Sequence, residues 1–152
     1  MTPSKINKEV VTQRISWILQ MIEAMRELPL QNQTEFLKDK RNVASAESYL
    51  RRTLEALLDL GRHILAKGFG YPATEYKDVA RGLLEKTVLR QEEAALLNKM
   101  AGYRNRMVYF YHEITPKELY EICRYHLDEI KQILDKLTEW LKKNREKMDE
   151  GI

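Results

Sequence analysis

The sequence predicts an all-α fold, an antiparallel up-down bundle of four main helices plus a short helix. Helix-favouring residues are abundant, while the 152 residues include only 6 Gly and 4 Pro. Apolar residues recur mostly every three to four positions through long segments, as on one face of a helix. Segments that contain proline or glycine separate these stretches.

Composition narrows the class of protein. With 43% hydrophobic residues, residues 1–152 can bury a core and fit a single domain. A net charge of +3 does not by itself indicate nucleic-acid binding. The single cysteine, Cys123, excludes an internal disulfide, fits a reducing cytosol and is expected to be a small core residue. No apolar run approaches the ~20 residues of a membrane span, so we expect a cytoplasmic protein with no membrane partner.

The first helix is predicted to follow Pro3-Ser4 and to end at Leu28-Pro29-Leu30, because proline cannot continue a helix. Its apolar stripe consists of Ile6, Val10, Ile15, Trp17, Ile18, Met21, Ile22 and Met25. Thr34 is predicted to cap the short start Thr34-Glu35-Phe36-Leu37. The next long helix is expected over about Lys40–Lys67.

Gly61 lies within the apolar stripe of that helix, which suggests a close helix crossing. The segment Gly68-Phe69-Gly70-Tyr71-Pro72 is the clearest break in the chain. Thr74 is predicted to start a shorter helix that runs through Lys86 and turns Tyr76 inward.

Two further helices complete the predicted bundle. One covers Gln91–Phe110. The other begins at Thr115 as the cap, with Pro116 in the first turn and Glu118 completing a capping box. It continues as one helix through Trp140. The charged tail, residues 142–152, is expected to fray.

The segment whose composition best suits a chemical role is Tyr103–His112, which combines an Arg-Asn-Arg cluster with tyrosines and a histidine. No acidic residue occurs from Ala94 to His112, so this region makes a local positive field. If the helix continues far enough, four of these side chains share one rim: Arg104, Asn105, Tyr109 and Tyr111. The alternative is a solvated basic face with aromatic packing.

The other polar candidates have simpler interpretations. His63 follows Asp59 by four residues, but two ligands are too few for a metal site, and a surface or helix-contact pair is favoured. His126 lies on an apolar stripe and is expected to be a hydrogen-bonded core residue. His112 could transfer protons near neutral pH. The sequence has no Gly-rich phosphate loop, Cys-x-x-Cys pair or His-Glu-x-x-His, so neither a cofactor nor a metal is expected.

Residues 103–114, Tyr-Arg-Asn-Arg-Met-Val-Tyr-Phe-Tyr-His-Glu-Ile, resemble the signature of HepT-like toxins in the HEPN superfamily. That signature is Arg, often Asn, then four to six residues and His, with a Tyr two residues after the His. Residues 56–64, Ala-Leu-Leu-Asp-Leu-Gly-Arg-His-Ile, are similar to the family's second helix.

The resemblance implies a HEPN-like fold and a metal-independent endoribonuclease that acts as a homodimer. It also implies a minimal nucleotidyltransferase antitoxin, which can silence the toxin by adding AMP to the motif tyrosine. Carried over by position, Arg104 is the motif arginine, Asn105 the following polar residue and Tyr111 the AMP acceptor, while Arg106 adds positive charge.

One position departs from the family pattern, because Tyr109 stands where the family has histidine. RNA cleavage without a metal needs a group that moves protons near neutral pH. A phenol, with an ordinary pKa near 10, is a poor base, so reduced or absent cleavage is expected. His112 is a possible substitute base, since it follows Arg106 by six positions.

Two other classes of function remain open from the sequence. The chain could be a non-catalytic helical module that binds nucleotides or a partner protein and needs no general base. It could also be a helical oligomerisation protein whose aromatic segment forms an interface core; exposed Tyr103, Tyr109 and Tyr111 in a monomer would disfavour this.

Overall fold

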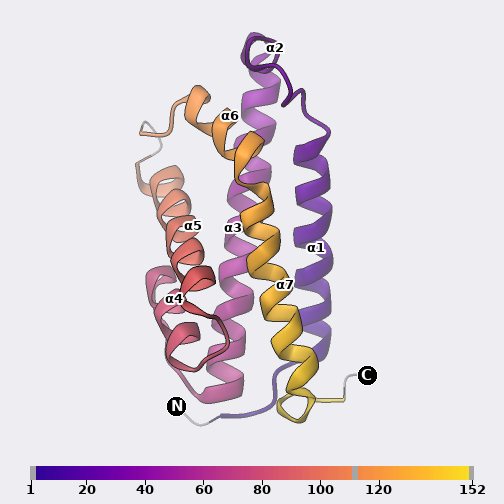
Figure 1. Cartoon of the computed structure of the whole chain (residues 1–152), viewed down its shortest axis with the longest axis vertical. Helices are drawn as coiled ribbons and strands as arrows, with labels where there is room; N and C mark the ends of the chain where they lie inside the picture. The colour runs from indigo at the N-terminus through magenta and orange to yellow at the C-terminus, as the bar shows by residue number, and fades with distance from the viewer. Residues whose placement is uncertain (1–2, 111–112, 151–152) are drawn as a thin grey trace.

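The computed structural model describes residues 3–110 and 113–150, and over these residues the secondary structure is helical. The elements are α1 (Lys8–Arg26), α2 (Gln33–Lys38), α3 (Lys40–Phe69), α4 (Tyr76–Glu85), α5 (Gln91–Tyr109), α6 (Pro116–Tyr125), α7 (Leu127–Lys143) and the 3₁₀ helix η1 (Arg145–Lys147). They form an elongated bundle with both chain ends at the same end of the long axis (Figure 1). The all-α prediction is confirmed.

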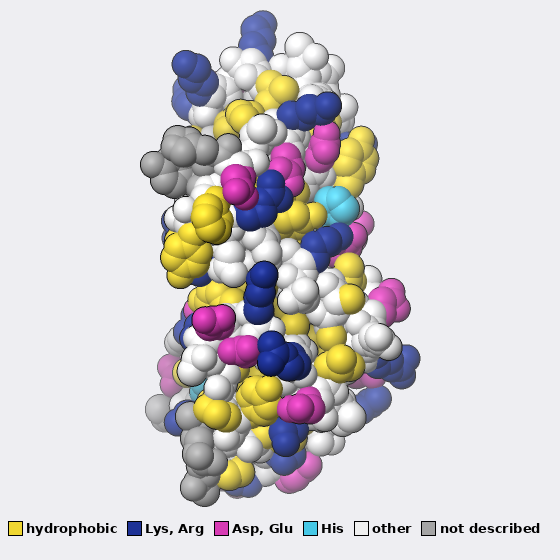
Figure 2. Space-filling view, turned by 90° about the vertical axis from the view of Figure 1, so that its left-hand side faces the viewer, with side chains coloured by type: hydrophobic (Ala, Val, Ile, Leu, Met, Phe, Trp, Pro, Cys, Tyr) yellow, Lys and Arg dark blue, Asp and Glu magenta, His cyan; other side chains and the backbone are white. Residues whose placement is uncertain are grey.

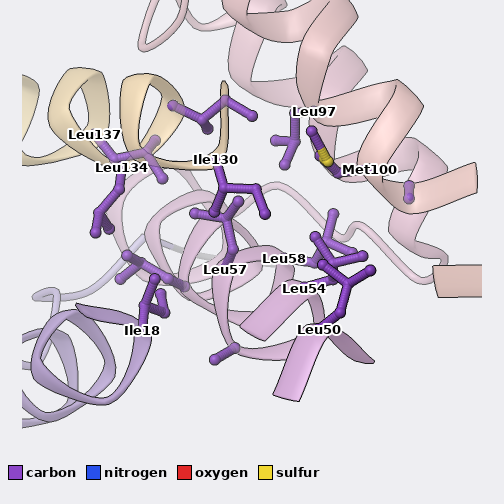
Figure 3. Packing of buried hydrophobic residues seen from close by; sticks show 14 of the residues in the cluster. Ile18, Leu50, Leu54, Leu57, Leu58, Leu97, Met100, Ile130, Leu134 and Leu137 are labelled. Atoms are coloured by element: carbon purple, nitrogen blue, oxygen red, sulfur yellow. The ribbon is translucent and has the colours of Figure 1, made fainter. Parts of the chain in front are cut away.

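Helix α3 is the centre of the molecule. It contacts α1 along its length and also contacts α2, α4, α5 and α6. Its predicted range, Lys40–Lys67, agrees with the observed helix to within two residues. The core is built from apolar side chains of α1, α3, α5 and α7, among them Ile18, Leu57, Met100 and Ile130 (Figure 3). Burial of these aliphatic groups is the main favourable term in folding.

Gly61 lies where α3 and α4 cross most closely. A Cβ atom at this position would come within 2.7 Å of Val79 Cγ1 and 3.0 Å of Leu83 Cδ1. These distances confirm the close crossing that the sequence suggested. Helix α3 ends about two and a half turns later, where Gly70 is its C-cap. The φ of 63° at Gly70 is a left-handed conformation that glycine adopts without strain.

Two helix starts differ from the prediction. The cap of α2 is Asn32, whose side chain accepts a hydrogen bond from the Glu35 N–H at 3.0 Å, so Thr34 lies inside the helix. Helix α4 begins at Tyr76 and not at Thr74, because the Glu75 N–H donates to Asp78 Oδ2 at 3.3 Å and sets the first turn there. In both cases a nearby Asx side chain competes successfully with the threonine.

The last predicted helix is two helices, α6 and α7, separated at His126. The His126 side chain is 32% exposed, so the expected place in the core is wrong. The expected hydrogen bond is present, because the His126 Nδ1 lies 3.0 Å from Glu129 Oε2. The break between the helices brings this polar ring to the partly buried carboxylate of Glu129, while Leu127 and Ile130 enter the core. Cys123 is buried as expected, and burial raises the pKa of its thiol to about 12.

The charged segment after α7, predicted to fray, is instead in contact with the N-terminal segment as far as Asp149. The Ile6 N–H donates to the Lys147 carbonyl at 2.8 Å, and the Asp149 N–H donates to the Ile6 carbonyl at 2.9 Å. Asp149 Oδ1 also accepts from the Lys8 N–H at the start of α1, a favourable position for a negative charge. Composition suggested fraying, whereas long-range backbone pairing orders the segment.

Candidate functional site

Helix α5 carries the candidate residues on its last two turns. Leu97, Met100 and Met107 are buried and fix which face of α5 points to the core. Because successive residues turn by about 100°, Arg104 and Asn105 then lie beside this buried stripe, toward α3 and α4. The helix ends at Tyr109, and the Phe110 N–H still donates to the Arg106 carbonyl. The predicted helix end at Phe110 is therefore confirmed to within one residue.

Arg104 is the most enclosed cation of this region, with its side chain only 16% exposed. Its Nη2 donates to Glu55 Oε2 at 3.2 Å, and its Nη1 donates to Asn105 Oδ1 at 3.3 Å. Burial lowers the pKa of Arg104, but the hydrogen bond to Glu55 acts in the opposite direction and the net shift is upward. The guanidinium therefore remains a permanent cation in a partly desolvated place.

Two tyrosines contact the Arg104 guanidinium. Its Cζ lies 4.7 Å from the centre of the Tyr76 ring and 5.7 Å from the centre of the Tyr109 ring. Both distances are within the range of cation–π interactions. Tyr109 is 66% exposed, whereas Tyr76 is half-buried.

Tyr76 is itself held by Asp59 of α3. The Tyr76 hydroxyl donates to Asp59 Oδ1 at 2.9 Å, and Arg62 Nη2 donates to the same oxygen at 2.7 Å. Burial and the hydrogen bond to Asp59 raise the pKa of Tyr76 to about 12, so its phenol stays protonated at neutral pH. The Arg62 Cζ lies 4.8 Å from the centre of the same ring.

These groups surround a pocket of about 490 Å³. The residues that line it come from α3, the segment before α4, α4 itself and α5: Arg62, Thr74, Glu75, Tyr76, Arg104, Asn105 and Tyr109. Three residues predicted from the sequence, Arg104, Asn105 and Tyr109, are thus brought together. The lining is mostly polar and includes two arginines, which suits a phosphate-bearing ligand.

Arg106 does not line this pocket. Its Nη1 and Nη2 donate to the two carboxylate oxygens of Glu118 at 2.8 and 2.7 Å, and Nη2 also donates to the Glu113 carbonyl. The hydrogen bond from Arg106 holds the pKa of Glu118 below its ordinary value. The Glu118 N–H donates to Thr115 Oγ1 as predicted, but the Glu118 side chain turns to Arg106 and does not complete the capping box.

The remaining candidates are separate from the pocket or outside the described residues. Tyr111 and His112 fall outside the part of the chain that the structure describes. His63 does not pair with Asp59; its Nε2 accepts a hydrogen bond from the Asn7 N–H at 3.0 Å. Within residues 3–110 and 113–150, no group of three or more His, Cys, Asp or Glu side chains could hold a metal ion.

Sequence reasoning did not predict the other four lining residues, Arg62, Thr74, Glu75 and Tyr76, as part of the site. Tyr76 was expected to face the core, and Arg62 was not singled out, yet both contact the pocket. The spacing of Asp59 and Arg62, three apart on one helix, is a signal that could have indicated this cluster. Figure 2 views the side formed by α4 and α5, where basic, acidic and apolar side chains are interspersed.

The sequence matches the family described as "Ribonuclease HepT-like" over residues 18–137. The chain belongs to this family. The match covers most of the bundle and includes Arg62, Tyr76 and the whole of α5. Comparison with curated proteins finds no significant match. None of the described helices is long and apolar enough to cross a membrane.

Solved structures show the same fold. The tri-AMPylated Shewanella oneidensis HEPN toxin in complex with MNT antitoxin matches with a TM-score of 0.78 and 22% identity, over 87% of this chain and 98% of that one. A toxin–antitoxin structure with AMP-PNP matches with a TM-score of 0.77 and 22% identity, over 86% and 98% of the two chains. YutE from Bacillus subtilis, described as a cytosolic protein of unknown function, matches with a TM-score of 0.74 and 16% identity, over 88% of this chain and 89% of that one.

Proposed function

We propose that this chain is the toxin of a toxin–antitoxin pair, a metal-independent HEPN endoribonuclease whose cleavage is impaired by Tyr109. The observation that carries the proposal is Arg104, a permanent cation that shares an open pocket with Asn105 and Tyr109 in a HepT-like ribonuclease chain. We expect the protein to act in the cytoplasm as a homodimer.

Arg104 would serve the chemistry by binding the scissile phosphate. In metal-free cleavage the RNA 2′-oxygen bonds to phosphorus while the bond to the 5′-oxygen breaks. Negative charge then accumulates on the phosphoryl oxygens, where a forked guanidinium stabilises it. Asn105, which accepts from Arg104 Nη1, would orient the guanidinium.

The proton transfers are the step that this chain performs poorly. The 2′-hydroxyl must lose a proton, and the leaving 5′-oxygen must gain one. Position 109 holds a tyrosine, and among the described residues that line the pocket there is no histidine. Arg104 therefore remains as the phosphate-binding group, while position 109 lacks the imidazole that would move protons near neutral pH.

Restoring the imidazole tests the proposal. Tyr109→His should give cleavage of a labelled RNA and arrest growth of the host when expressed, and adding Arg104→Gln should abolish both effects. Tyr125→His is the matched control, because Tyr125 is also 66% exposed and lies outside the pocket. If Tyr109→His gains neither activity, the impaired-ribonuclease proposal is wrong.

The absence of a histidine among the described lining residues also favours a second candidate, a non-catalytic module that binds nucleotides or the partner protein through the same pocket. The two candidates differ in one measurement. A ribonuclease scaffold recovers cleavage when position 109 is histidine, whereas a pure binding module binds RNA or nucleotide without cleaving it in either form.

Regulation by a nucleotidyltransferase antitoxin belongs to the same proposal. We infer that a small partner of this class adds AMP to Tyr111, which would block RNA and offset the positive charge at the site. Co-expression followed by intact-mass measurement should show increments of one or more AMP groups, and Tyr111→Phe should remove the increment that belongs to this residue. An unchanged mass pattern in Tyr111→Phe would rule out this acceptor.

A further inference from the structure

We propose that the pocket binds two phosphates of a single RNA strand, with Arg62 as a second phosphate-contacting residue beside Arg104 and Tyr76 as the residue that positions both. This inference assigns a specific path for the RNA and therefore depends on the proposed function. Arg62 and Tyr76 lie outside the Arg-Asn motif, on α3 and α4, and line the same pocket as Arg104.

The charges around the pocket are unbalanced in favour of an anion. Glu55 and Asp59 lie one turn apart on α3. Glu55 is shared by Arg51 and Arg104, at 2.7 and 3.2 Å. Asp59 is shared by Arg62 at 2.7 Å and, more distantly, by Arg14 at 4.0 Å.

Each carboxylate is thus shared by two guanidiniums, so neither arginine of the pocket is fully neutralised. Glu75 also lines the pocket, but it is exposed and its charge is screened by solvent. The four arginines outnumber the three carboxylates even when Glu75 is counted. The site is therefore cationic without any contribution from Arg106.

The guanidiniums retain donors for a ligand. A guanidinium carries five N–H donors. Arg62 uses one of its terminal nitrogens on Asp59. Arg104 donates from Nη1 to Asn105 and from Nη2 to Glu55, and each of these terminal nitrogens carries a second N–H.

Tyr76 fixes the positions of the two cations. Both guanidiniums contact its ring, at 4.7 and 4.8 Å from Cζ to the ring centre. The position of the ring is fixed, because the Tyr76 hydroxyl donates a hydrogen bond to Asp59, which also accepts one from Arg62. Two cations held against one rigid platform lose little side-chain entropy when the ligand binds.

The size and lining of the pocket favour an RNA backbone. A volume of about 490 Å³ fits the range of small-ligand sites and accommodates a nucleotide unit. The lining is mostly polar and carries two guanidiniums, which recognise phosphates, and Tyr76 and Tyr109 are its only aromatic side chains among the described residues. Two adjacent phosphates of one RNA strand supply two negative charges, one for each of these guanidiniums.

The test is binding of a 5′-fluorescein-labelled eight-nucleotide oligouridylate, followed by fluorescence anisotropy between 50 and 200 mM NaCl. The proposed function predicts that the probe survives, because Tyr109 stands in the position of the motif histidine. Arg62→Gln should weaken binding about tenfold, as for loss of one charge-assisted contact, and lower the salt slope by about 0.7. A purely structural role for Arg62 would leave the salt slope unchanged.

Arg81→Gln is the matched control. Arg81 also pairs with an aspartate three positions away, Asp78, but it lies outside the pocket. We expect the affinity of Arg81→Gln for the oligouridylate to remain within about twofold of that of the unsubstituted chain. Tyr76→Leu should weaken binding about as much as Arg62→Gln, while Tyr76→Phe, which keeps the ring, should recover part of the affinity.

The outcomes separate this inference from the proposed function. If Arg104→Gln weakens binding and Arg62→Gln does not, RNA still binds at Arg104 and the two-phosphate site is overturned. If neither change affects binding, both proposals fail. Should Arg62→Gln unfold in a thermal melt, Arg62→Lys keeps the charge; the proposal then requires weaker binding with an unchanged salt slope, and unchanged affinity would contradict it.

Discussion

Arg104 and Arg106 stand two positions apart on α5, and their surroundings are opposite. Arg104 shares Glu55 with a second arginine and faces an open pocket. Arg106 holds Glu118 through both of its terminal nitrogens and joins the end of α5 to the start of α6. In the sequence Arg-Asn-Arg the two arginines look equivalent. In the structure Arg104 shares its carboxylate with a second arginine and remains available to a ligand, whereas Arg106 is neutralised by Glu118.

The largest expected effect concerns RNA binding at these two positions. Arg104→Gln should lower the affinity for the oligouridylate about 10- to 100-fold, because a desolvated, charge-assisted contact to phosphate is lost. Arg106→Gln should change it by about twofold or less, because Glu118 already takes its charge. Anisotropy titrations at one salt concentration measure both, and equal losses would show that the comparison is wrong.

The next effect concerns the helix crossing that places Tyr76 beside Arg104. Gly61→Ala should destabilise the protein by about 1–3 kcal/mol, because the added methyl group would meet Val79 at 2.7 Å and push α4 away. RNA affinity should fall as well, since the pocket spans both helices. Urea unfolding and the anisotropy titration measure the two effects.

Gly102→Ala is the control for that change. Gly102 lies inside α5, and a Cβ atom there has nothing within 4 Å. The substitution should therefore stabilise the protein by about 0.5–1 kcal/mol through helix propensity alone. A loss of stability at Gly102 equal to that at Gly61 would mean that the crossing distance is not the cause.

The sequence predicted the helices that carry the site better than it predicted the contacts between those helices. Apolar periodicity located α3 and α5 to within about two residues at each end, and on α5 it placed Arg104 and Asn105 beside the buried stripe. These predictions succeed because they depend on one helix at a time. Tyr76 was instead expected to face inward, because an aromatic residue on an amphipathic stripe gives no sign of a hydroxyl bond to α3.

The parts that were missed depend on contacts between distant segments. Whether Arg62 meets Tyr76 is set by the angle at which α4 crosses α3, and no periodicity encodes that angle. The break at His126 was missed because the three-four apolar spacing continues across it. The pairing of Ile6 with Met148 joins residues at opposite ends of the chain and leaves no local pattern.

A smaller effect concerns the role of Arg106 as a clamp between α5 and α6. A double-mutant cycle with Arg106→Gln and Glu118→Gln should give a coupling free energy of about 1 kcal/mol, because the pair is bidentate but about one third exposed. Urea unfolding at pH 7 measures it. A coupling near zero would mean that the two contacts do not hold the helices together.

The same pair predicts a response to acid. Arg106 lowers the pKa of Glu118 below its ordinary value of 4.5, so the pair stabilises the fold above that pH. This contribution should be lost as the pH falls through the lowered pKa, because the native carboxylate then becomes protonated. Glu118→Gln should show a smaller loss of stability over the same range, measured by unfolding at pH 6 and pH 3.

The smallest effect concerns His63. Like Arg106, it lies close in sequence to a residue of the pocket but forms its hydrogen bond outside the pocket. Its Nε2 accepts the Asn7 N–H, and burial lowers its pKa below the ordinary 6.5, followed by smaller effects of Lys67 and Arg14. As the pH falls through 6.5, the unfolded chain takes up a proton before the native chain does. Stability from this contact is therefore full above pH 6.5 and decreases below it. His63→Gln keeps an acceptor that does not titrate, so the difference between unfolding midpoints at pH 8 and pH 5.5 should shrink; an unchanged difference would place the pH response on another group.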